Sequence, residues 1–187
     1  MPGSTLIFGW GNPSRGDDAL GPLFVERLEN LASTHPEWGR LYFQTDFQLQ
    51  VEHALDLHGH DRVLFVDASS SGPAPFNVLA LRAAKDASFT THAMTPQAVM
   101  HTYCELEAQS PPPAWLLGIR GERFELGEDL SPMAQAHLLA ALRWVESWLA
   151  AGGRAGSSAD MHREGNLGWP TGLEPATTGI TIQDSTN

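Results

Sequence analysis

The stretch between residues 9 and 21 constrains the fold of this chain more than any other. It reads Gly-Trp-Gly-Asn-Pro-Ser-Arg-Gly-Asp-Asp-Ala-Leu-Gly. Residues 5–8 before it form a short apolar run typical of a β-strand, and apolar residues after it recur at helical spacing as far as Leu31. The pattern predicts a strand, a glycine-rich turn and an amphipathic helix. Ligands of open α/β sheets bind at such strand ends.

Two adjacent carboxylates, Asp17 and Asp18, distinguish this turn from a nucleotide-binding loop. A pyrophosphate site needs bare N–H groups and a further glycine where the helix begins. Carboxylates at that place repel phosphate and attract metal ions. The two aspartates could instead have a purely structural role. In that case one caps the helix, and the other is solvated near the positive end of the helix dipole.

Composition excludes several classes of protein. At 187 residues and 42% hydrophobic content, the chain is long enough for one domain with a substantial core. It contains no apolar run long enough to span a membrane and no secretory signal, so we expect a cytoplasmic protein. A net charge of −11 disfavours nucleic acid and anionic membranes as partners, and the single cysteine excludes an intrachain disulfide.

Strand and helix patterns alternate along the rest of the chain, which predicts an α/β fold with a mostly parallel sheet. Thr95-Pro96 and Ser131-Pro132 each have an N-cap residue followed by proline, so each begins a helix. We expect strands at residues 41–44, 62–66, 76–81 and 114–119, the third of them antiparallel, and a helix within residues 47–57.

Two further residues are candidate metal ligands. Asp67 directly follows the apolar run 62–66, at a strand end where Asp18 could reach the same ion, although aspartate is also a common turn residue. His92 comes just before the helix that starts at Pro96, with His101 inside that helix as its rival. Three other histidines match no metal motif, and we interpret them as surface or capping residues: His53, His58 and His60.

The pattern Gly-x-Gly-Asn-Pro-x-x-Gly-Asp-Asp-x-x-Gly closely resembles the opening motif of the endopeptidases that mature nickel-iron hydrogenases. The sequence Val-Asp-Ala-Ser at residues 66–69 is similar to the same family. The resemblance implies a three-layer α/β/α sandwich with a mostly parallel, mixed five-stranded sheet. It covers residues 1–151, and we expect the polar extension 152–187 to be disordered.

The same resemblance implies a function. The protein would remove the C-terminal extension of a nickel-iron hydrogenase large-subunit precursor after nickel insertion. Asp18, Asp67 and His92 would be the metal-binding and catalytic residues, either in chemistry or in docking, and Asp17 would support the loop. The nickel would be carried by the substrate, and no organic cofactor is implied.

Two other classes of function remain open from the sequence. A non-enzymatic nickel-binding chaperone could use the same three ligands without cutting a peptide bond. A peptidyl-tRNA hydrolase also begins with a strand and a Gly-x-Gly-Asn-Pro loop, but its RNA-facing surface should be basic, whereas this chain is acidic.

Overall fold

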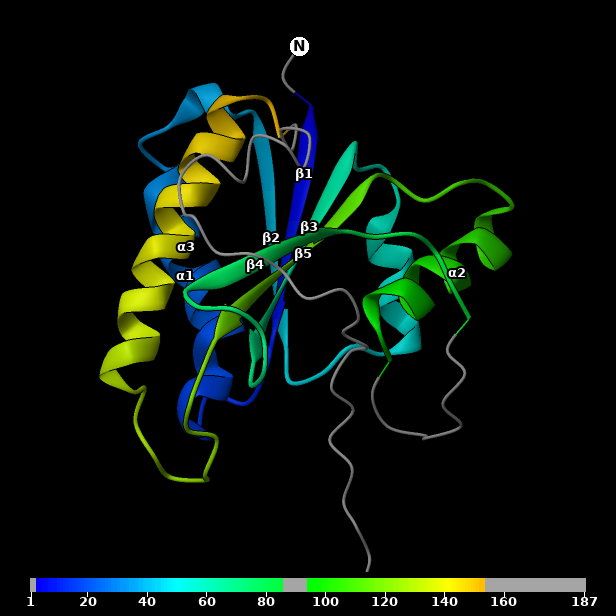
Figure 1. The fold of residues 1–187 in the computed structure, drawn as a ribbon. Coiled ribbons are helices and arrows are strands. Elements are labelled where there is room, and N and C mark those ends of the chain that lie inside the picture. The colour runs from blue at the N-terminus through cyan, green and yellow to red at the C-terminus, as the bar shows by residue number, and fades with distance from the viewer. Residues whose placement is uncertain (1–2, 86–93, 154–187) are drawn as a thin grey trace, which may run out of the picture. The chain divides into compact units, whose positions relative to one another are not determined.

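Five strands form one sheet at the centre of the protein (Figure 1). The computed structural model describes residues 3–85 and 94–153. The strands lie in the order β2-β1-β3-β5-β4, and only β4 is antiparallel to its neighbour. This confirms the mixed, mostly parallel sheet with an antiparallel fourth strand. The strand bounds are β1 Ser4–Trp10, β2 Arg40–Asp46, β3 Arg62–Ser69, β4 Phe76–Ala80 and β5 Ala114–Arg120.

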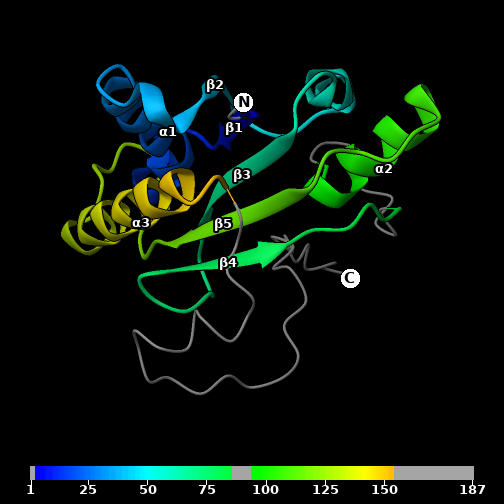
Figure 2. The ribbon, with the colours of Figure 1, turned by 90° about the horizontal axis from the view of Figure 1, so that it is seen from above.

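Helices cover both faces of the sheet and complete the predicted three layers (Figure 2). α1 (Leu20–Ala32) and α3 (Pro132–Ala150) pack on one face, and α2 (Pro96–Glu107) packs on the other together with the 3₁₀-helix η3 (Val51–Leu57). Two further 3₁₀ turns lie at Gly16–Ala19 (η1) and Pro36–Trp38 (η2). Each face has its own apolar core because successive side chains of a strand point to opposite sides.

The two predicted helix starts are confirmed by their capping bonds. The Thr95 side chain accepts a hydrogen bond from the backbone N–H of Ala98 at 3.2 Å. The Ser131 hydroxyl does the same for Ala134 at 3.1 Å. In both helices the following proline has no N–H to leave unsatisfied, so it fits the first turn.

Two details of the sequence interpretation need correction. The helix expected within residues 47–57 is the 3₁₀-helix η3, which begins at a capping box formed by Gln50 and His53. Of the two interpretations of His53, surface or capping, the structure confirms capping, and the side chain is buried. β3 continues past residue 66 because its pairing with β5 extends to Ser69, so Asp67 lies in the last part of the strand rather than after it.

All described residues belong to one unit, Met1–Arg154. The predicted extension lies outside the described residues except for its first two, Gly152 and Gly153, whose N–H groups bond carbonyls at the end of α3. No helix within the described ranges is long and apolar enough to cross a membrane.

Candidate functional site

The glycines of the first turn bring the start of α1 against the ends of two strands. A Cβ on Gly9 would lie 2.5 Å from the carbonyl oxygen of Gly21. A Cβ on Gly21 would lie 2.9 Å from the carbonyl oxygen of Val66 and would collide with that of Trp10. Only glycine permits this backbone contact. The contact places η1, which carries Asp17 and Asp18, at the carboxyl edge of the sheet.

Asp17 is fully buried and supports the loop rather than facing the solvent. Its carboxylate accepts hydrogen bonds from the backbone N–H groups of Glu122, Arg123 and Ser131 and from the Ser131 hydroxyl, at 2.7–3.0 Å. Burial by itself raises the pKa of Asp17, but these four hydrogen bonds outweigh it and lower the pKa below its ordinary value. The carboxylate therefore stays charged, and it joins the first turn to the segment that precedes α3.

Asp18 and Asp67 lie close enough to affect each other. Asp18 Oδ2 accepts the backbone N–H of Asn12 at 2.9 Å, and Asp67 Oδ1 accepts that of Ala68 at 2.8 Å. Burial raises the pKa of Asp67 to about 7; the Ala68 N–H opposes the rise, and the negative charge of Asp18 adds to it. Two neighbouring carboxylates at one edge, one of them with a raised pKa, are typical of a site that binds a cation or transfers a proton.

The third sequence candidate, His92, lies outside the described residues. Its rival His101 lies on α2, with Nε2 3.3 Å from Glu105 Oε1 on the same helix. Within residues 3–85 and 94–153, no three His, Cys, Asp or Glu side chains are grouped closely enough to hold a metal ion. The described part of the site is thus the pair of Asp18 and Asp67.

A row of residues, one from each strand, crosses the sheet at the level of Asp67. In the register of the sheet, Asp67 is paired with Gly118, and Gly118 is paired with Asn77. On the other side of Asp67, the last pair between β1 and β3 is Gly9 with Val66, so the next residue of β1, Trp10, lies beside Asp67. Trp10 is in turn paired with Asp46 on β2. Residues paired in this way point to the same face of a sheet. We call these five residues the edge row: Asp46, Trp10, Asp67, Gly118 and Asn77.

Sequence reasoning identified Asp67 but missed the other four members of the edge row: Asp46, Trp10, Gly118 and Asn77. Asp46 ends β2 at the same edge where Asp67 approaches the end of β3, so the strand-end rule that identified Asp67 also applies to it. Asp46 Oδ2 lies 3.3 Å from Nε2 of the buried His53, whose Nδ1 accepts the backbone N–H of Gln50 at 2.9 Å. That bond leaves the imidazole proton on Nε2, facing Asp46.

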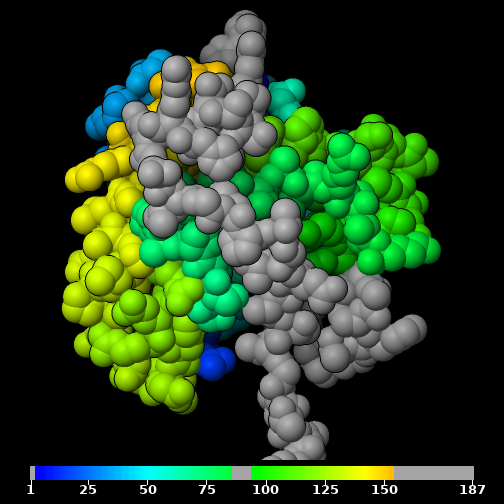
Figure 3. Space-filling view, viewed as in Figure 1, coloured from blue at the N-terminus to red at the C-terminus, as the bar shows by residue number. Residues whose placement is uncertain are grey.

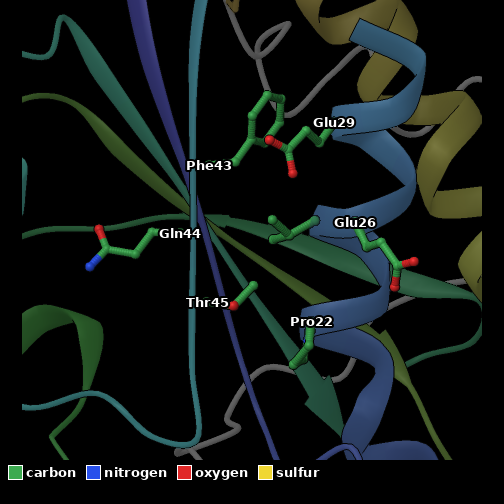
Figure 4. A pocket seen from close by; sticks show the side chains of 7 residues that line it. Pro22, Glu26, Glu29, Phe43, Gln44 and Thr45 are labelled. Carbon is green, nitrogen blue, oxygen red and sulfur yellow. The ribbon is translucent and has the colours of Figure 1, made fainter. Parts of the chain in front are cut away.

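One surface groove lies away from these carboxylates. It has a volume of about 260 Å³ and lies between α1 and β2 (Figure 4). Its lining residues are Pro22, Val25, Glu26, Glu29, Phe43, Gln44 and Thr45. Figure 4 shows the side chain of Gln44 on the opposite side of β2 from the α1 residues, and its amide donates to Asp56 at 2.8 Å.

Comparison with solved structures links this arrangement to one group of proteins. A NiFe hydrogenase maturation protease HycI from Thermococcus kodakarensis KOD1 superimposes with a TM-score of 0.61 and 21% identity, over 79% of this chain and 92% of that one. The hydrogenase maturating endopeptidase HybD from E. coli superimposes with a TM-score of 0.60 and 23% identity, over 80% and 94%. The fold is that of the hydrogenase maturation proteases.

A hydrogenase 2 maturation peptidase from a Thaumarchaeota archaeon gives the same result, with a TM-score of 0.55 and 20% identity over 81% of this chain and 99% of that one. No protein-family model and no curated protein matches the sequence. At these identities the likeness establishes the fold, which agrees with the fold implied by the glycine-rich motif.

Proposed function

We propose that this protein is an endopeptidase that removes the C-terminal extension of a nickel-iron hydrogenase large-subunit precursor. The observation that carries the proposal is the placement of Asp18 beside Asp67 at the carboxyl edge of a sheet with this fold. Each of the similar solved structures named above is a hydrogenase maturation protease or peptidase.

Nickel held by the precursor is the cation that we propose these two carboxylates recognise, with His92 as the third ligand. Carboxylate oxygens and an imidazole form a donor set that suits nickel, zinc or manganese and leaves positions free for groups of the substrate. The two carboxylate oxygens of Asp17 are already engaged by four donors, so we assign Asp17 to holding the turn in place. Asp18 is then the aspartate of this turn that would bind the ion.

The reaction is hydrolysis of one amide bond. A water molecule gives up a proton as its oxygen bonds to the scissile carbonyl carbon, and that proton passes to the amine nitrogen as the C–N bond breaks, which leaves a carboxylic acid and an amine. Before the cation is bound, burial raises the pKa of Asp67 to about 7, and we propose that this carboxyl group exchanges protons with water or the departing amine when it is not bound to the cation. The proposal leaves two roles for the carboxylates, docking of the nickel end of the substrate and proton transfer during cleavage.

The direct test is incubation of the protein with a nickel-loaded large-subunit precursor, followed by mass spectrometry of the large subunit. We expect one loss of mass, equal to a C-terminal peptide, and a stable product thereafter. Binding of the precursor without any loss of mass would instead support the nickel-binding chaperone. Release of tRNA from peptidyl-tRNA would support the hydrolase alternative.

A further inference from the structure

Gly118 leaves a gap in the edge row beside Asp67. Its neighbours in the row are Asp67 on β3 and Asn77 on β4. Adjacent strands lie about 4.8 Å apart, so the backbones of Asp67 and Asn77 are separated by roughly 10 Å. Because the residue between them has no side chain, a side chain from a neighbouring strand can lie over it.

The carboxamide of Asn77 leans into this gap. A Cβ on Gly118 would lie only 2.6 Å from Asn77 Oδ1, whereas the next neighbour, Ser69 Cβ, is 3.6 Å away. The Asn77 side chain is therefore directed across Gly118 toward the strand that carries Asp67. It is half-buried, and within residues 3–85 and 94–153 its carboxamide makes no hydrogen bond.

We infer that Asn77 binds the main chain of the substrate as it crosses the edge row beside Asp67. This inference rests on the proposed function. A carboxamide carries both a donor and an acceptor, which together complement the C=O and N–H of an extended peptide. Gly118 allows the Asn77 carboxamide to lie over the sheet on the Asp67 side of β4, so the scissile segment would cross the sheet edge in contact with both side chains.

A structural role competes with this one. A Cβ on Gly72 would lie 3.3 Å from Asn77 Oδ1, so the segment after β3 also touches the carboxamide. That segment has other anchors, however: the Gly72 N–H donates to the Ser69 hydroxyl at 2.9 Å, and the Arg120 guanidinium donates to the Gly72 carbonyl at 2.6 Å. Loss of the Asn77 carboxamide should therefore leave this segment in place.

The test compares Asn77→Ala with the wild type in both binding and cleavage of the nickel-loaded precursor. We expect the dissociation constant and KM to rise roughly tenfold, the effect of one neutral hydrogen bond, while kcat and the melting temperature stay near the wild-type values. The matched control is Leu79→Ala, two residues along the same strand and face and exposed; it should bind and cleave within about twofold of the wild type.

A double-mutant cycle with Gly118→Ala adds a second readout. The new Cβ fills the gap and displaces the Asn77 carboxamide, so Gly118→Ala should weaken binding at least as much as Asn77→Ala. The combined variant should be little worse than Gly118→Ala alone, because both changes remove the same contact.

The outcomes separate this inference from the proposed function. If wild-type protein binds the precursor without cleaving it, and Asn77→Ala binds about tenfold more weakly, the protease proposal fails and the role of Asn77 stands. If the wild type cleaves and Asn77→Ala binds and cleaves equally well, or is impaired only through a lowered melting temperature, the role of Asn77 is wrong. Absence of any binding by the wild type overturns both.

Discussion

Asp17 and Ser131 are joined by two hydrogen bonds although 114 residues separate them in the chain. Ser131 donates both its backbone N–H, at 2.7 Å, and its hydroxyl, at 2.8 Å, to the buried Asp17 carboxylate. The same hydroxyl accepts the N–H of Ala134 and so caps α3. One carboxylate thus fixes both the turn that carries Asp18 and the start of the last helix. In Figure 3 the segment before α3 is the yellow-green region below the yellow atoms of that helix.

Asp17→Asn should destabilise the protein by about 3 kcal/mol. The amide keeps one acceptor oxygen and introduces an N–H₂ group where four donors already converge, so buried groups lose their partners. Urea unfolding at pH 7 measures the change. The matched control is Asp129→Asn, an exposed aspartate in the segment between β5 and α3 that donates to Asp17, which should change the free energy of unfolding by less than about 0.5 kcal/mol.

Acid should remove this contribution of Asp17. Its pKa is lower in the folded protein than the ordinary value of 3.8, so the stabilisation is complete above about pH 4 and is lost as the pH falls toward the folded-state value. The difference in unfolding free energy between wild type and Asp17→Asn should therefore shrink below pH 4. A difference that stays constant from pH 6 to pH 3 would show that the charge of Asp17 is irrelevant.

Asp67→Asn should raise stability at alkaline pH. The pKa of Asp67 is about 7 in the folded protein against 3.8 as the ordinary value, so the cost of burying its charge appears as the pH rises from about 4 to 7. The neutral amide avoids that cost. Thermal melts should show the variant above the wild type at pH 8 and a smaller difference at pH 5, whereas an equal difference at both would contradict the raised pKa.

Gly21→Ala tests the close packing of α1 on the strands. Its Cβ would meet backbone oxygens of Trp10 and Val66, which cannot rotate away as a side chain can, so we expect a loss of about 3 kcal/mol or more. Gly127→Ala is the control: this glycine has φ of 83° and no atom within 4 Å of its Cβ position, so only backbone strain of about 1 kcal/mol applies. Chemical denaturation compares the two.

The sequence sufficed to predict the architecture because the relevant signals are local. The apolar run 62–66, the N-cap and proline pairs at Thr95 and Ser131, and the glycine spacing in residues 9–21 each specify a backbone conformation within a few neighbouring residues. The alternation of these elements then favours a parallel sheet with helices on both faces, and the structure confirms it.

Local sequence patterns could not identify hydrogen-bond or strand-pairing partners that lie far apart in the chain. The role of Asp17 depends on three residues more than 100 positions away, and only the folded chain brings them together. The edge row likewise depends on long-range pairing: Asn77 lies in the same row as Asp67 only because β4 and β3 both pair with β5 in a fixed register. The assignment of Asp18, Asp67 and His92 as ligands remains a prediction.

Cleavage of the precursor by Asp18→Asn tests the central claim most directly. The variant keeps the size and hydrogen-bonding ability of the side chain but removes the charge that attracts a cation, so the fold should survive. Wild type, Asp18→Asn and the control Asp129→Asn are each incubated with nickel-loaded and nickel-free precursor, and the mass of the large subunit is followed. We predict cleavage of the nickel-loaded precursor by the wild type and the control alone; equal cleavage by Asp18→Asn, or of nickel-free precursor, would contradict the account.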